Sequence, residues 1–235
     1  MISEPNSASR EEVGPRVLMN SSNVFPGAIP SVTPGAVIAS SSGLVLRYVR
    51  DDDAEAIIGL ISAVWSEYPG KVLVPETDMP ELLKPATSYA VCDGRFWVIE
   101  ANGRIIGTVA LQPSEEPGVV ELQKLYVTRG LRRNGVGGFL CSLVDREARQ
   151  RGAHAIELWS DVKLLDAHRR YEELGYRRGP EIRQRDDNSQ TVQYYYRKPV
   201  AIDAATTVPD PDDDLPGWLS RLNIMIAPSQ ETPAA

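Results

Sequence analysis

The sequence predicts an α/β (α+β) fold, in which a mixed β-sheet carries helices on both of its faces. Three observations support this prediction. Early in the chain, two β-prone runs flank Asn102-Gly103, a pair that favours a tight hairpin turn. Later, strand-like and helix-like stretches alternate, which is typical of β-α-β units. Of the 235 residues, 42% are hydrophobic, enough for one domain with a core of ordinary size.

The folded domain is expected to lie between two tails. Residues 1–43 are rich in Ser, Pro, Gly and Asn, and we expect a disordered N-terminal tail because this composition buries too little apolar surface to offset its ordering entropy. We assign the domain to residues 44–199, and an acidic linker with a C-terminal tail to residues 200–235. The start of translation, Met1 or Met19, and the role of both tails stay open.

The first elements follow from local patterns. In "LVLRYVR", Leu44, Leu46 and Tyr48 alternate with their neighbours as in a strand. The Asp cluster that opens "DDDAEAIIGLISAVWSEY" suits a helix N-terminus, and the apolar residues after it recur on one helical face. Residues 66–90 contain four prolines and predict a loop with one short helix around residues 79–83.

The remaining elements come in quick succession. A hairpin, "RFWVIEANGRIIGTVALQ", is followed by a strand at residues 119–127 and then by a helix for which Gly152 is a suitable C-terminal residue. A strand in "AIELWS" precedes a short helix, "DAHRRYEELGY", which stops at Gly175. "TVQYYYRK" is the closing strand.

Composition and charge exclude several classes of protein. The net charge of −7 argues against a general nucleic-acid binder, which carries a basic footprint. No apolar run approaches the roughly 20 residues of a membrane-spanning helix. Cys92 and Cys141 are too few for a disulfide framework, and no His, Cys and Asp cluster has metal-ligand spacing, so we expect a cytoplasmic protein without a metal.

One stretch, "LYVTRGLRRNGVGGFL", combines a strand end, a basic cluster and glycines at the start of a helix. Helix N-termini hold phosphates well because their N–H groups are unpaired and carry partial positive charge. The nucleotide P-loop is excluded, since its Lys-Ser or Lys-Thr is absent. The dinucleotide fingerprint is excluded too, because Gly135 and Gly137 are followed by Leu140 where a third glycine is required. The stretch therefore predicts a cradle for a small diphosphate.

Two motifs resemble those of the GNAT N-acetyltransferase superfamily. "RRNGVG", residues 132–137, is similar to the family's R/Q-x-x-G-x-G/A signature, and "AHRRYEELGY" is similar to its A-x-x-x-Y-x-x-x-G-[FY] motif. The resemblance covers about residues 44–199 and implies a GNAT-like sheet of six to seven mostly antiparallel strands. One departure is Leu164, where many members of the family have Asn.

The resemblance implies that acetyl-CoA is the cosubstrate and that a primary amine of a small molecule or peptide attacks it directly in a ternary complex. The edge of the family's fourth strand pairs with the pantetheine chain, and its N–H groups polarise the thioester carbonyl. Whether the chain forms a homodimer is left open. The residues implied to bind acetyl-CoA are Leu125, Tyr126, Val127, Arg132, Arg133, Asn134, Gly135, Val136, Gly137 and Gly138.

Two residues match catalytic positions of the family. Glu121 is implied as the general base that deprotonates the amine through a water, although it also reads as a solvent-exposed strand residue. Strand alternation places it on one face with Gln123, Leu125 and Val127, unless a bulge intervenes. Tyr171 is implied as the acid that protonates the thiolate, although its helical spacing also suits a core aromatic residue.

Other side chains leave alternatives open. His168 is a second candidate base, although we expect an exposed helical histidine, and Trp159 is either a core residue or a wall of the acceptor pocket. That pocket is built in this family by the first helix, the loop after it and the C-terminal strands. The loop region carries Trp65, Glu67, Tyr68, Glu76 and Asp78. A non-catalytic acyl-CoA-binding sensor is the alternative function.

Overall fold

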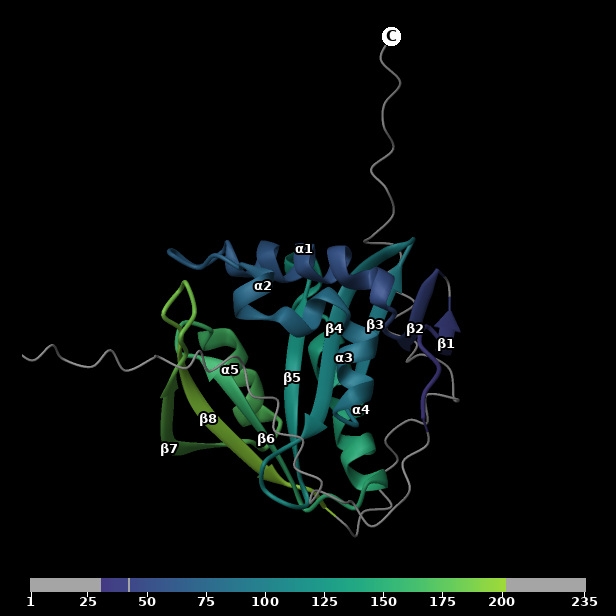
Figure 1. Cartoon of the computed structure of the whole chain (residues 1–235). Helices are drawn as coiled ribbons and strands as arrows, with labels where there is room; N and C mark the ends of the chain where they lie inside the picture. The colour runs from purple at the N-terminus through teal and green to yellow at the C-terminus, as the bar shows by residue number, and fades with distance from the viewer. Residues whose placement is uncertain (1–30, 42, 202–235) are drawn as a thin grey trace, which may run out of the picture.

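The computed structural model describes residues 31–41 and 43–201, which form around one eight-stranded sheet (Figure 1). The strand order is β1-β2-β3-β4-β5-β6-β8-β7, and only β5 and β6 pair in parallel within this described part. The predicted mixed, mostly antiparallel fold is confirmed, with eight strands where six to seven were expected. The strands are β1 (Val37–Ser41), β2 (Leu44–Tyr48), β3 (Arg95–Ala101), β4 (Arg104–Pro113), β5 (Val119–Val127), β6 (Ala155–Asp161), β7 (Arg177–Gln184) and β8 (Val192–Pro199).

Helices cover both faces of the sheet, as predicted. On one face, Ile57 and Ile61 of the first helix belong to a buried cluster with Phe96 of β3. On the other face, Leu140 and Val144 belong to a second buried cluster. The first face carries α1 (Ala54–Trp65), α2 (Pro75–Asp78) and α3 (Pro85–Val91), and the second carries α4 (Val136–Gln150) and α5 (Leu165–Glu173) (Figure 1).

The two strands that the sequence did not predict lie at the edges of the sheet. β1 falls within the segment assigned to the N-terminal tail, so the predicted domain boundary at Leu44 is too late; its antiparallel pairing with β2 supplies the order that its own composition does not. β7 contains Gly179-Pro180, and an edge strand tolerates this pair through an irregular register with β8. Residues 1–30 and 202–235, most of the predicted tails, lie outside the described residues.

The segment between α1 and β3 is more helical than expected. Three prolines each begin an element: Pro75 starts α2, Pro80 starts a 3₁₀ turn that ends at Leu83, and Pro85 starts α3. Proline suits the first turn of a helix because the N–H that it lacks would have no partner there. The prolines that predicted a loop therefore mark helix starts.

β5 and β6 pair over only three residues. Val119, Val120 and Glu121 face Ala155, Ile156 and Glu157, and beyond this point the two strands diverge. The other edges of both strands stay occupied, since β5 pairs with β4 and β6 pairs with β8. The C-terminal half of β5 thus has a backbone edge that faces a gap in the sheet rather than another strand (Figure 1).

A β-bulge interrupts β5 just beside this gap. Thr108 of β4 pairs with Tyr126, whereas Ala110 pairs with Gln123, so β5 carries one extra residue at this point. Lys124 lies within the bulge at φ +50°, and its carbonyl accepts a 2.7 Å hydrogen bond from the Thr108 hydroxyl. The bulge reverses the alternation of side chains along the rest of the strand.

The described helices were also compared with the requirements of a lipid bilayer. Within residues 31–41 and 43–201, none of them combines the length and the apolar character that crossing a membrane requires.

Candidate active site

The predicted cradle, residues 132–138, forms the start of α4. Gly135 is the N-cap residue with φ +83°, a left-handed conformation that glycine adopts without strain. The first helical hydrogen bond runs from the Phe139 N–H to the Gly135 carbonyl at 3.0 Å. The backbone N–H groups of Val136, Gly137 and Gly138 precede this bond and have no carbonyl behind them in the helix. They are the donors that a diphosphate needs.

The two following glycines of the cradle have different neighbours. A methyl group at Gly138 would meet the terminal guanidinium of Arg170 from α5, and this side chain would have to shift. A methyl group at Gly137 would lie 4.0 Å from Cγ2 of Val127, so the helix start lies beside the end of β5.

The polar residues of the cradle have different environments. Arg132 binds both carboxylate oxygens of Glu67, just after α1, at 2.7 and 2.8 Å, and its Nε donates to the Val127 carbonyl at 3.1 Å. Arg133 is 85% exposed and lies 3.6 Å from Asp166. Asn134 is exposed as well. Of the two arginines predicted to meet the diphosphate, Arg132 is held by two hydrogen bonds to Glu67, whereas Arg133 makes only a long, solvent-exposed contact with Asp166.

A cavity lies at the gap where β5 and β6 diverge. Its walls come from residues 122–126 of β5, residues 159–161 of β6, and Leu164 and Tyr171 beside them. The outer walls come from the α1–α2 segment and from the β7–β8 hairpin. The hydroxyl of Ser160 is buried here and has no hydrogen-bond partner among the described residues. The cavity thus brings together the predicted pantetheine edge, Leu125 and Tyr126, and the predicted acid.

Tyr171 belongs both to the core and to the cavity. Its ring packs against Tyr176 and Tyr196, with ring centroids 5.8 Å away in each case. Burial raises the pKa of the phenol far above its ordinary value, with smaller contributions from Cys141 and Tyr126. The hydroxyl therefore keeps its proton at neutral pH, and both sequence interpretations of Tyr171 describe part of its environment.

Glu121 lies outside this cavity. Its carboxylate accepts hydrogen bonds from Gln123 at 2.9 Å and from Gln112 at 3.4 Å, and lies 3.8 Å from Arg183. The expectation that Glu121 and Gln123 share a face with Leu125 and Val127 is wrong, because the bulge at Lys124 intervenes. Val127 belongs to the core beneath α4, whereas Tyr126 packs beneath α1. Gln123, which lines the cavity, stands between Glu121 and the open space.

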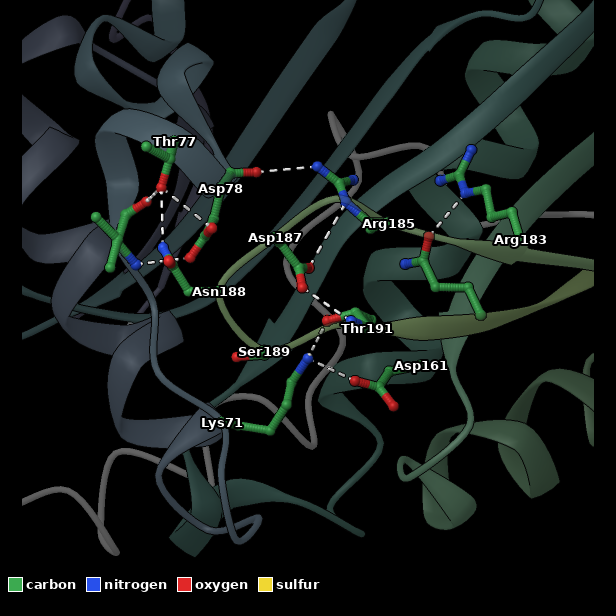
Figure 2. A network of polar contacts seen from close by, with 12 residues as sticks. Lys71, Thr77, Asp78, Asp161, Arg183, Arg185, Asp187, Asn188, Ser189 and Thr191 are labelled. Carbon is green, nitrogen blue, oxygen red and sulfur yellow. Dashed lines mark hydrogen bonds and ion pairs between the residues drawn. The ribbon is translucent and has the colours of Figure 1, made fainter.

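The part of the cavity lined by the α1–α2 segment and the β7–β8 hairpin, which we call its acceptor side, holds a network of charges that the sequence did not predict (Figure 2). The ammonium of Lys71 lies 2.6 Å from Asp161 Oδ2 and 2.6 Å from the Thr191 hydroxyl, and 4.1 Å from the centre of the Trp65 ring. Arg185, beside Thr191, donates to the Asp78 carbonyl at 3.0 Å. These residues lie far apart in the chain, and no local motif marks them.

The remaining candidates divide clearly. Trp65, Tyr68 and Asp78 line the cavity as expected, whereas Glu67 pairs with Arg132 and Glu76 is exposed. Trp159 is a wall of the pocket. His168 is not the exposed residue that the helix pattern suggested: it is buried, its Nε2 lies 2.9 Å from the Asp161 carbonyl, and burial lowers its pKa. It does not line the cavity.

Comparison with known proteins identifies the class to which this fold belongs, the acetyltransferases of the GNAT family. A model of the Acetyltransferase (GNAT) family matches residues 58–176, just over half of the chain. The chain belongs to this family.

Individual relatives agree. The chain is 32% identical over 129 residues to "Probable N-acetyltransferase camello" of Xenopus tropicalis, covering 52% of this chain and 58% of that protein. It is 26% identical over 136 residues to the aminoalkylphosphonate N-acetyltransferase of Salmonella typhimurium, covering 56% of this chain and 84% of that protein. The fold matches the structure of "a putative ACETYLTRANSFERASE from Salmonella typhimurium with its cofactor Acetyl-CoA". The TM-score is 0.53 and the identity is 16%, and the match covers 71% of this chain and 99% of that chain. The chain spans about half the length of the first curated relatives.

Proposed function

We propose that this chain is an acetyl-CoA-dependent N-acetyltransferase that acts on a primary amine of a small molecule or peptide by direct attack in a ternary complex. One observation supports the proposal: the bare start of α4 follows β5 in the chain, and the unpaired edge of β5 lines one cavity together with Tyr171. These are a diphosphate site, an edge for an amide chain, and a proton donor, arranged in sequence.

The residues present fit acetyl-CoA. The N–H groups of Val136, Gly137 and Gly138 would hold the diphosphate, with Arg133 adding charge at the rim. The edge of β5 from Leu125 to Val127 would pair with the pantetheine amides as an added strand does. When bound there, acetyl-CoA supplies an activated acetyl group, and an N–H of the same edge polarises its carbonyl.

Tyr171 would stabilise the departing thiolate. Because burial raises its pKa, the phenol remains protonated and donates a hydrogen bond, while complete transfer of its proton is disfavoured. We therefore assign Tyr171 as a donor to the thiol sulfur at the moment the C–S bond breaks. The amine must lose a proton before it attacks, and this proton must reach a base.

Glu121 remains our candidate for that base. A primary amine with a pKa near that of lysine, about 10.4, is present as its ammonium form at neutral pH and must lose a proton before it attacks. Because Gln123 separates Glu121 from the cavity, the proton would travel through water held at Gln123.

The experiment has two parts. Calorimetry with acetyl-CoA measures the predicted cosubstrate site, and mass spectrometry of the products after incubation with an amine panel detects acetyl transfer. We prefer mass spectrometry to a thiol-reactive dye because Cys92 is exposed. Folded protein that shows no saturable binding of acetyl-CoA would refute the proposal at its base.

The position of Glu121 favours one alternative. A non-catalytic acyl-CoA sensor needs the cradle and needs no base, and the carboxylate of Glu121 is already engaged by two glutamines. Tight binding of acetyl-CoA without turnover of any amine would support the sensor. A lower turnover in the Glu121→Gln variant, with acetyl-CoA affinity unchanged, would exclude the sensor.

A further inference from the structure

The charges around the acceptor cavity are unevenly matched. Asp78 accepts a 2.7 Å hydrogen bond from the Val74 N–H, and Asp187 accepts one of 2.8 Å from the Thr191 N–H. Asp161 holds Lys71 at 2.6 Å and accepts a 2.9 Å hydrogen bond from the Lys163 N–H. All three carboxylates that line the cavity therefore serve the protein itself (Figure 2).

Two arginines on the same side of the cavity are less well satisfied. Arg185 gives one terminal nitrogen to the Asp78 carbonyl, and its Nε lies 3.8 Å from Asp187, beyond hydrogen-bond distance. Arg183 gives its Nε to Gln193 at 2.7 Å, and its nearest carboxylate, Glu121, is 3.8 Å away. Within the described residues, no hydrogen-bond partner is recorded for either terminal nitrogen of Arg183 or for the second one of Arg185.

The two guanidiniums belong to one surface. They are two residues apart, Arg183 in β7 and Arg185 just after it, so they share a face of the β7–β8 hairpin with Gln193 of β8 and with Thr191 just before it. Arg183 lies 4.4 Å over the ring of Trp159, a wall of the cavity. Each of the two side chains is 39% exposed, and both burial and the positive charge of Arg185 lower the pKa of Arg183. Two forked cations with spare donors, close together and partly out of water, favour the binding of an anion.

This anion is not the diphosphate of acetyl-CoA. The proposed diphosphate site is at the start of α4, and Leu140 of this helix packs in one buried cluster with Leu158 of β6. Trp159 and the two arginines lie on the opposite face of β6 and its neighbours, because successive residues of a strand point to opposite faces. The surface belongs to the acceptor.

We propose that the acceptor is a small amine that also carries an anionic group, a carboxylate or a phosphonate, and that Arg185 and Arg183 bind this group. The inference rests on the proposed transferase function and names the substrate class of the same site. A bidentate contact to Arg185 holds the anion at the hairpin while the amine extends toward the gap between β5 and β6. The amine enters the reaction as the nucleophile, and the anionic group only positions it.

The test compares amines that differ in the anionic group. Amino acids are paired with their carboxamides, and 2-aminoethylphosphonate with ethanolamine, each with acetyl-CoA and with the product measured by mass spectrometry. We expect kcat/KM to be at least about tenfold higher for the acid of the preferred pair, about 1.4 kcal/mol of discrimination. Arg185→Gln should abolish this preference mainly through KM, Arg183→Gln should weaken it, and Arg185→Lys should restore part of it.

The matched control is Arg177→Gln, on the same strand, exposed and outside the cavity. It should leave the acid preference intact. Equal kcat/KM for acids and carboxamides in the wild type, or a preference that survives in the Arg183→Gln/Arg185→Gln double variant, would overturn the proposal while the transferase function stands.

Binding separates the two hypotheses if no amine is acetylated. The melting temperature is measured with CoA present, with each acid or its carboxamide added, and with sodium acetate as the control for a simple anion. Stabilisation by an acid that is lost in Arg185→Gln supports the anion site even without turnover, and then the transferase function is what fails. If no acid stabilises the wild type beyond acetate and none is acetylated, the anion site is refuted.

Discussion

The cradle at the start of α4 and the acceptor side of the cavity are assembled in different ways. The cradle is one contiguous stretch, residues 132–138, whose geometry comes from the conformation of its glycines and from the start of α4. The acceptor side joins Lys71 to Asp161 and Thr191, residues that are contributed by three separate segments. The first depends on local backbone preferences, and the second depends on the whole fold. Substitutions should therefore act differently in the two regions, on affinity in the cradle and on folding stability at the acceptor side.

The largest effect on stability is expected from Lys71→Met. Lys71 and Asp161 have side chains only 3% and 7% exposed, and removal of one partner leaves the other as a buried, unpaired charge. Such losses cost about 3–5 kcal/mol of the free energy of unfolding. Denaturant titration measures this loss. The double variant Lys71→Met/Asp161→Asn should recover most of it, because the unpaired charge is then gone.

A surface pair is the control for this prediction. Arg169 and Asp166 are 75% and 70% exposed at 3.7 Å, so Arg169→Met should leave the denaturation midpoint nearly unchanged. A small effect of Lys71→Met, comparable with that of the surface pair, would mean that the acceptor side does not depend on this network.

The largest effect on catalysis is expected from Tyr171→Phe. The loss of the donor to the departing thiolate should lower kcat by about 100-fold, with little change in acetyl-CoA affinity. Tyr176→Phe is the matched control, because Tyr176 packs on the same ring and its buried hydroxyl has no recorded hydrogen-bond partner in the described residues. Steady-state kinetics of both variants separate a reacting hydroxyl from a core aromatic residue.

The pH profile gives an independent readout of Tyr171. Because burial raises the pKa of this phenol, the folded protein keeps its proton through the range near pH 10 in which an ordinary tyrosine ionises. No loss of kcat from Tyr171 should appear up to pH 10 in the wild type. The same shift stabilises the fold below pH 10, and this contribution declines as pH rises above the unfolded value, since the unfolded chain ionises first.

Sequence reasoning predicted the helix start after residues 132–135 and the place of Tyr171 on a short helix, because each depends on spacing within one element. It missed the acceptor network, since nothing near Lys71 in the chain indicates Asp161 or Thr191. It also missed the bulge in β5: Lys124 adopts φ +50° without a glycine or asparagine to signal it, and the hydrogen bond from Thr108 that holds it is tertiary. A strand pattern read by alternation alone therefore placed Glu121 and Leu125 on the same face.

In the cradle, Gly135→Val should reduce acetyl-CoA affinity. A β-branched residue at φ +83° is strained by about 1–2 kcal/mol, and relief of this strain moves the first amides of α4. We expect at least about tenfold weaker binding in calorimetry. Gly130→Ala is the control, because that position has open space around it and no positive φ. Equal affinity in the two variants would remove the cradle from the binding site.

The smallest effects concern the two arginines that the sequence treated alike. A double-mutant cycle of Arg132→Ala with Glu67→Ala should give a coupling of about 1 kcal/mol, reduced by solvent because the side chains are 32% and 20% exposed. The cycle of Arg133→Ala with Asp166→Ala should give no measurable coupling, since both side chains are largely exposed. Denaturant titrations of the six variants and the wild type supply both values.

Repetition of the first cycle with saturating acetyl-CoA decides what Arg132 does. Its fork is fully used by Glu67, which ties the cradle to the end of α1 and so to the acceptor side. If the coupling persists when acetyl-CoA is bound, Arg132 is a brace between the two regions and the diphosphate is held by amides and Arg133. If the coupling vanishes, Arg132 exchanges its carboxylate for the diphosphate, as the motif predicted, and binding of acetyl-CoA then releases Glu67 from the cradle.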